Sequence, residues 1–276
     1  MTALTLLIVI SGQTPSGALA QTPNTTASTR GENDRQLLQY LDELRLNRLS
    51  LALLERQYAR QTDSSLRVEL GKQLAVRYQQ AMLAKGQRNE IGQLIQKVES
   101  LLRDFGQLDT PPLRLALSHA SFLQIEDRFF DWWREGAAPE ESRLLSSDLE
   151  QTKSELARQQ RISNQQRNDL IAVLPLSSDS SLIEQSKISE LEARLVHIDF
   201  LIAWCHYFHA VAVPIPDDDL LKQSHEHFLA SLHLEPVASI DNLKIKWIDF
   251  DTSFSNRALL GLALVYAAQD LSLIHI

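Results

Sequence analysis

The densest group of potentially reactive side chains in this chain of 276 residues is WCHYFH, residues 204–209. On a helix, Cys205 and His209 are four residues apart, a spacing at which two side chains can bind one metal ion. His225 or His227 would supply a third ligand, but not both, because residues two apart on a helix point in different directions. The alternative is a buried, aromatic-rich helix whose histidines hydrogen-bond to neighbouring groups. We favour this alternative, and no metal is expected.

Two other clusters, one acidic and one aromatic, also have structural explanations. Asp217–Asp219 would suit a cation, but acidic residues at a helix start are explained by N-capping and by the helix dipole. The aromatic cluster suits either an interaction surface, where such rings are enriched, or core packing at a helix end, which we favour. Its members are Phe129, Phe130, Trp132 and Trp133.

Catalytic and nucleotide-binding motifs are absent from the sequence. It contains no GxGxxG or GxxxxGK[ST] loop for phosphates, no HExxH zinc helix and no GxSxG nucleophile elbow. Its 27 basic and 35 acidic residues give a net charge of −8, which disfavours a nucleic-acid partner because phosphates are bound by clustered Lys and Arg. The single cysteine excludes a disulfide framework. These features predict a non-catalytic protein without a cofactor.

The first 20 residues resemble a secretory signal peptide. An apolar stretch, residues 3–10, is followed by Ala18-Leu19-Ala20, the small-x-small pattern of a cleavage site between Ala20 and Gln21. No Lys or Arg precedes the apolar stretch, so either the signal is weak or the true start lies upstream. A buried first helix is the alternative. Residues 21–33 predict a flexible linker, and no later apolar run is long enough to cross a membrane. We expect a periplasmic or secreted protein.

The last six residues, 271–276, read LSLIHI and resemble the translation of a sequencing adaptor. On this interpretation the natural chain continues beyond Asp270 with other residues. The alternative is a genuine apolar turn at the C-terminus.

Residues 34–136 show helical periodicity interrupted by capping signals. Apolar residues recur at i, i+3, i+4 and i+7, as in the helix that carries Leu94, Val98 and Leu101. The predicted N-caps are Asn33, Asp63, Asn89 and Thr110, and the predicted stops are Gly86, Gly106 and Gly136.

Residues 137–180 predict one long polar helix with a following loop. Leu145, Leu149 and Leu156 form a thin apolar seam among Gln, Ser, Arg and Glu. Such a seam is typical of a coiled-coil-like helix and favours a position outside the core.

Residues 181–270 predict a helix over 182–212 whose apolar stripe widens into LIAWCHYFHAVAV, apolar nearly all round and expected to be buried. A helix capped by Asp217, a short extended piece at 243–250 and a final helix capped by Ser255 follow. In this region four residues resemble the second helix of a tetratricopeptide repeat: Ser224, Phe228, Ser231 and Pro236. The first helix of that repeat is resembled by Ala75 with Tyr78 and by Ala263 with Tyr266, where a small residue precedes an aromatic one.

The resemblance covers about a third of the chain and is degenerate, because the other helix pairs are irregular and lack the recurring Trp, Gly and Pro. It implies an all-α array of stacked helix pairs, an irregular solenoid with one long polar helix in the middle. It also implies binding of a protein or peptide on a concave helical surface. Together with the signal-like N-terminus, it leads us to expect an exported bacterial protein of this type. An irregular helical bundle is the structural alternative. The functional alternative is the N-terminal accessory region of an exported enzyme whose catalytic domain follows.

Overall fold

The computed structural model describes residues 34, 36–84, 90–136, 139–173, 181–213, 216–234 and 253–274, and within these ranges every regular element is a helix. The prediction of an all-α chain is confirmed. The chain divides into two units, Met1–Leu53 and Leu54–Ile276. The signal-like segment, the linker, Ala20 and Gln21 lie outside the described residues.

The first unit contains a short helix, residues 36–43, and the start of α2 (Asn47–Arg60). A turn joins them, and Arg45 lies in it with φ at 55°. The hydroxyl of Ser50 donates a hydrogen bond to Asp42 across 2.9 Å.

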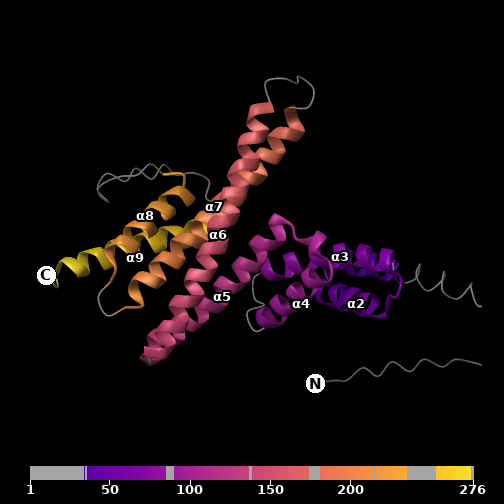
Figure 1. The fold of residues 1–276 in the computed structure, drawn as a ribbon, viewed down its shortest axis with the longest axis horizontal. Helices are drawn as coiled ribbons and strands as arrows, with labels where there is room; N and C mark the ends of the chain where they lie inside the picture. Colours follow the sequence, from indigo (N-terminus) through magenta and orange to yellow (C-terminus); the bar gives the residue numbers. More distant parts are fainter. Residues whose placement is uncertain are drawn as a thin grey trace, which may run out of the picture. The chain divides into compact units, whose positions relative to one another are not determined.

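The second unit begins with the rest of α2, from Leu54 on. It continues through four helical elements: α3 (Ser64–Leu83), α4 (Ile91–Asp104), the 3-10 turn η2 (Gly106–Leu108) and α5 (Pro111–Glu135) (Figure 1). Asp63 caps α3 as predicted, since its carboxylate accepts hydrogen bonds from the backbone N–H groups of Ser65 and Leu66. Gly136 ends α5 with φ at 79°. Thr110 precedes α5 without a side-chain capping bond, and Gly106 starts η2 after α4 has ended. Asn33, Gly86 and Asn89 lie outside the described residues.

The rest of the second unit is formed by α6 (Pro139–Val173), α7 (Ser181–Val211), α8 (Asp218–Ser231) and α9 (Ser253–Ile274). α7 packs against α6 and α8, α6 also packs against α5, and α9 packs against α8 and α7. Asp217 caps α8 through the N–H of Leu220, as predicted. α9 begins at Ser253, so the prediction that Ser255 caps it is wrong. Residues 243–250 are not described.

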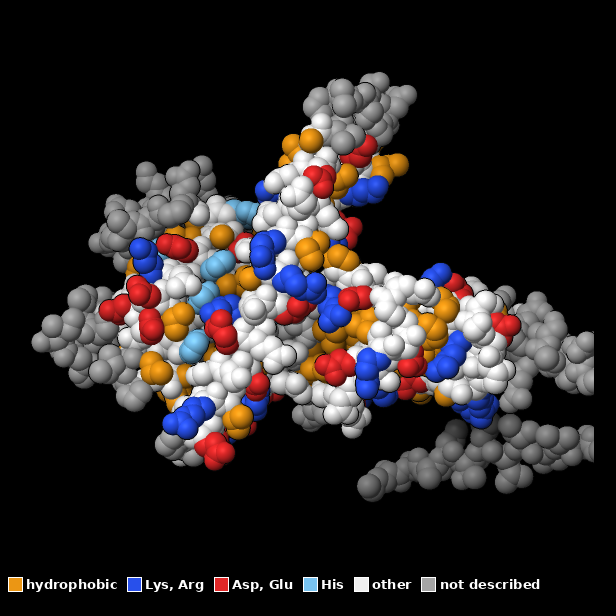
Figure 2. All heavy atoms as spheres, viewed as in Figure 1, with side chains coloured by type: hydrophobic (Ala, Val, Ile, Leu, Met, Phe, Trp, Pro, Cys, Tyr) orange, Lys and Arg blue, Asp and Glu red, His pale blue; other side chains and the backbone are white. Residues whose placement is uncertain are grey.

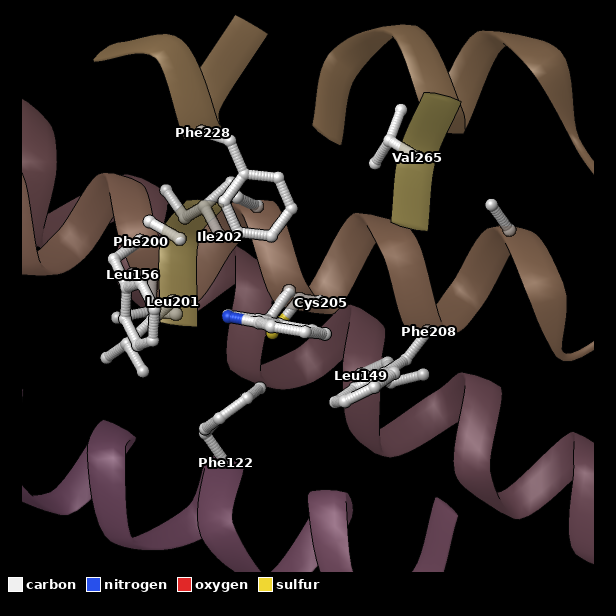
Figure 3. Close-up of a cluster of buried hydrophobic side chains, with 14 of the residues drawn as sticks. Phe122, Leu149, Leu156, Phe200, Leu201, Ile202, Cys205, Phe208, Phe228 and Val265 are labelled. Carbon is white, nitrogen blue, oxygen red and sulfur yellow. The ribbon is translucent and has the colours of Figure 1, made fainter. Parts of the chain in front are cut away.

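The main core lies among α5 to α9 and is rich in aromatic residues (Figure 3). Phe122, Leu149, Leu156, Phe208 and Phe228 are all fully or almost fully buried in it. The prediction that the Leu145, Leu149 and Leu156 seam lies outside the core is therefore wrong. The seam continues in heptad spacing through Thr152, Gln159 and Ser163, which are buried too.

None of the helices that the structure describes is both long enough and apolar enough to cross a membrane.

The small residues of α3, α8 and α9 allow neighbouring helices and side chains to approach. A Cβ at Gly261 of α9 would lie only 2.2 Å from the ring of Phe228 on α8.

Candidate functional site

The WCHYFH segment lies on α7 and is mostly buried. Cys205 is fully enclosed by the core, and burial raises the pKa of its thiol to about 12. Among the described residues, no group of three His, Cys, Asp or Glu side chains is arranged to hold a metal ion. Cys205 therefore acts as a small apolar side chain at neutral pH.

One of the histidines that sequence reasoning considered as ligands, His227, lies beside His206 between α7 and α8. The rings of His206 and His227 stack with centroids 5.7 Å apart. His227 Nδ1 lies 2.8 Å from the carboxylate of Asp199, which also accepts a hydrogen bond from Gln160 of α6. Burial lowers the pKa of His206 to about 4, so this imidazole is neutral at pH 7. Figure 2 shows histidine side chains gathered on the face over α7 and α8.

The aromatic cluster at the end of α5 is divided between the core and the surface. Phe129 is buried and stacks on Phe208 at a centroid distance of 4.3 Å. Trp132 is partly buried, and its indole N–H donates to the hydroxyl of Ser142 on α6. Phe130 is 43% exposed and Trp133 is 73% exposed. Core packing explains Phe129 and Trp132, whereas Phe130 and Trp133 face solvent.

The residues that carry the repeat resemblance on α8 make close helix contacts. The hydroxyl of Ser224 donates to the backbone carbonyl of Ala203 on α7 across 2.9 Å, and Phe228 is fully buried. Ser231 is also buried, and its hydroxyl bonds to the carbonyl of Phe228 within the helix. Pro236 lies outside the described residues.

The predicted packing residues of α9 need one correction. Ala263 is exposed, so the predicted close approach at this residue is wrong. Gly261, two positions earlier, makes the close contact with Phe228 instead. Tyr266 is partly buried, and its hydroxyl lies 2.8 Å from Nε2 of His225 on α8.

A pocket of about 220 Å³ lies among α2, α3 and α4, within the second unit. Leu74 and Leu101, both buried, supply its apolar lining. The polar lining comes from Glu55, Tyr58, Tyr78, Lys97, Ser100 and Asp104. Ala75 and Tyr78 were both predicted as packing residues. Ala75 is partly buried and the ring of Tyr78 is buried, as expected. Tyr78 also lines the pocket.

Glu55 joins the three helices around the pocket. Its carboxylate accepts a hydrogen bond from the hydroxyl of Tyr78 at 3.0 Å. Both of its oxygens also accept from the ammonium group of Lys97, at 2.8 and 2.9 Å. Burial and the nearby Glu55 carboxylate raise the pKa of Tyr78, so the phenol stays protonated and continues to donate.

Asp104 makes the corresponding contacts at the other side of the pocket. Its carboxylate accepts from the hydroxyl of Tyr58 and from the guanidinium group of Arg67, both at 3.2 Å. The same guanidinium group lies 4.8 Å from the centre of the Tyr58 ring, a cation–π distance. The tyrosine rings are therefore held in position before any ligand arrives.

Sequence reasoning did not find this pocket. Glu55 and Lys97 are 42 residues apart, and Tyr58 and Asp104 are 46 apart, so no local spacing signals their contact. Comparisons of the chain with protein-family models, with curated proteins and with solved structures give no match.

Proposed function

We propose that this protein is a non-catalytic, exported interaction scaffold that binds a protein or peptide through its helical surface. The observation that supports this proposal is the pocket among α2, α3 and α4, with its apolar lining and its fixed tyrosine, lysine and carboxylate groups. Pre-positioned polar groups around a small apolar surface are what a binding site needs for orientation and specificity.

The size of the pocket favours a peptide side chain over a free small molecule. Sites for drug-sized ligands generally occupy about 300–1,000 Å³, whereas this pocket has a volume of about 220 Å³. One or two side chains of a bound segment fit this volume. The remaining contacts of such a segment would spread over neighbouring helix surfaces.

The tetratricopeptide-like array is part of the same proposal. The Ser224 contact with Ala203 and the Gly261 contact with Phe228 bring consecutive helices close together, as stacked helix pairs require. Partner binding on a helical surface is how such arrays act.

Export rests on the signal-like residues 1–20 and predicts a processed N-terminus. The full gene, expressed in a Gram-negative host, should yield periplasmic or secreted protein whose mass spectrum shows Gln21 as the first residue. Protein that retains residues 1–20 in those fractions would contradict cleavage after Ala20.

Filling the pocket should weaken peptide binding. Peptides selected on the full chain from a random display library would be synthesised with a fluorophore and titrated by fluorescence anisotropy. Ser100 is exposed at the pocket, so Ser100→Trp places an indole into it without entering the core. We expect this substitution to weaken binding by at least about tenfold, a cost near 1.4 kcal/mol.

Ser147→Trp is the matched control, because Ser147 is an exposed serine in the N-terminal part of α6 and does not line the pocket. It should bind the peptides as the unmodified chain does. Peptides that bind equally well to both variants would show that the pocket is not the binding site. A library that yields no binder would count against the scaffold function itself.

A further inference from the structure

A buried histidine, His119, and a partly buried one, His197, meet the N-terminal part of α9 at its contact with α5 and α7. The rings of His119 on α5 and His197 on α7 lie edge to face, with centroids 4.9 Å apart. Phe254 of α9 lies against both rings, 4.6 Å from His197 and 6.3 Å from His119. It also contacts Phe200 at 5.3 Å.

One turn further along α9, Arg257 makes the second contact with the same two helices. Its guanidinium group forms an ion pair with Glu126 of α5, whose side chain is almost fully buried. The group also lies 5.5 Å from the ring centre of Phe200 and 5.9 Å from that of Trp204, both on α7. The N-terminal part of α9 is thus held on α5 and α7 by one ion pair and by ring contacts, whereas its later residues Leu262 and Val265 are buried in the main core.

The two imidazoles are placed where a positive charge is unfavourable. His119 is only 7% exposed. His119 Nδ1 and His197 Nε2 are buried atoms without a hydrogen-bond partner in the described part of the chain. Burial and then the charge of Arg257 lower the pKa of His119 to about 4, while burial and then His119 lower that of His197 to about 3. Both rings are therefore neutral while α9 is docked at pH 7.

We propose that α9 is an acid-sensitive latch, which is released from α5 and α7 when the His119–His197 pair takes up protons. A proton on either ring creates an unpaired buried charge, next to Arg257 or next to the other ring. Release of α9 exposes both imidazoles to water and removes Arg257 from their surroundings. This inference does not depend on the pocket among α2, α3 and α4.

Proton linkage gives the direction in which pH shifts the docking of α9. An exposed imidazole takes up a proton near pH 6.5, but docked His119 does so only near pH 4, so acid favours the released state between these values. At pH 5, His119 alone shifts the equilibrium between docked and released α9 by about 30-fold towards release. His197 adds to the shift in the same direction.

The other charged or titratable groups around the pair have partners of their own. They are Glu126 with Arg257, Asp199 with His227, Glu155 with Arg158, and His225 with Tyr266. Burial lowers the pKa of His225 as well. The test must therefore separate their effect from that of the histidine pair.

Hydrogen–deuterium exchange with mass spectrometry on the full chain measures the release. Protection factors, corrected for the intrinsic exchange rate at each pH, should fall at least about 30-fold for residues 253–274 between pH 7.5 and pH 5. Those of residues 191–205 on α7 should change far less. The variant His119→Met/His197→Met, which has no imidazole at either position, should keep its α9 protection at pH 5. His233→Met, at an exposed histidine, is the control and should behave as the unmodified chain does.

Either of two results in this experiment would overturn the latch. One is a simultaneous loss of protection in α6, α7 and α9, which indicates general acid unfolding. The other is an equal loss of α9 protection in the double variant, which assigns the effect to groups outside the histidine pair. If the double variant does not fold, His197→Phe keeps a ring against Phe254 and should raise α9 protection at pH 5 by about 30-fold over the unmodified chain. No rise in this variant would contradict the proposal.

Discussion

Replacing Phe208 by alanine is expected to lower the free energy of unfolding by about 3–5 kcal/mol, the usual cost of truncating a buried aromatic residue. Phe208 is 1% exposed and stacks on Phe129 at 4.3 Å and on Phe122 at 5.9 Å. Its ring also lies 5.2 Å from that of Trp204. Alanine would leave a cavity between α5 and α7 that these large, already packed rings cannot fill.

Urea denaturation followed by far-UV circular dichroism measures this loss without depending on tryptophan fluorescence. Trp133→Ala is the matched control, because Trp133 is an aromatic residue on α5 with 73% exposure. Its substitution should change the unfolding free energy by no more than about 0.5 kcal/mol. A loss below about 1 kcal/mol for Phe208→Ala would mean that the ring does not pack as described.

The positions of most helices could be predicted from the sequence, because helix signals are local. The i, i+3, i+4, i+7 spacing of Leu94, Val98 and Leu101 places all three on the buried face of α4. Asp63 and Asp217 cap α3 and α8 because a short carboxylate next to the first turn reaches its free N–H groups. Signals of this kind need no knowledge of neighbouring helices.

The burial of α6 could not be predicted, because it depends on partners that are distant in sequence. Gln159 is polar, but it is buried and donates a hydrogen bond to Ser118, 41 residues away on α5. The leucines of the same stripe, Leu149 and Leu156, lie in the main core. A stripe of mixed leucine and polar residues is therefore compatible with a central helix once its polar groups find partners.

The candidate site and the exposed part of the aromatic cluster could not be predicted either, because both depend on how helices pack together. The Glu55 contacts depend on the register between three helices, which no motif encodes. The sequence placed Phe129 and Trp133 in one cluster, but the rotation of α5 against α7 buries the first and leaves the second exposed. The residue types show that rings are present, and only the packing shows which of them remain available to a partner.

Substituting Gly261 by alanine is expected to destabilise the protein by about 2 kcal/mol. The new Cβ would lie 2.2 Å from Cζ of Phe228 and within 2.7 Å of two further ring carbons. The ring is fully buried and has no free space to occupy. Overpacking a core usually costs about 1–3 kcal/mol, and we expect a cost near the upper end, about 3 kcal/mol. The higher helix propensity of alanine offsets about 1 kcal/mol of this cost.

A double-mutant cycle tests whether the ring of Phe228 causes this loss. In a Phe228→Leu background, Gly261→Ala should cost at least about 1 kcal/mol less than in the unmodified chain, because the opposing ring is gone. Gly106→Ala is the control, since no atom lies within 4 Å of the position that a Cβ at Gly106 would take. The unfolding free energy of this variant should differ from that of the unmodified chain by no more than about 0.5 kcal/mol. An equal cost of Gly261→Ala in both backgrounds would show that close approach of α8 and α9 is not what requires glycine at this position.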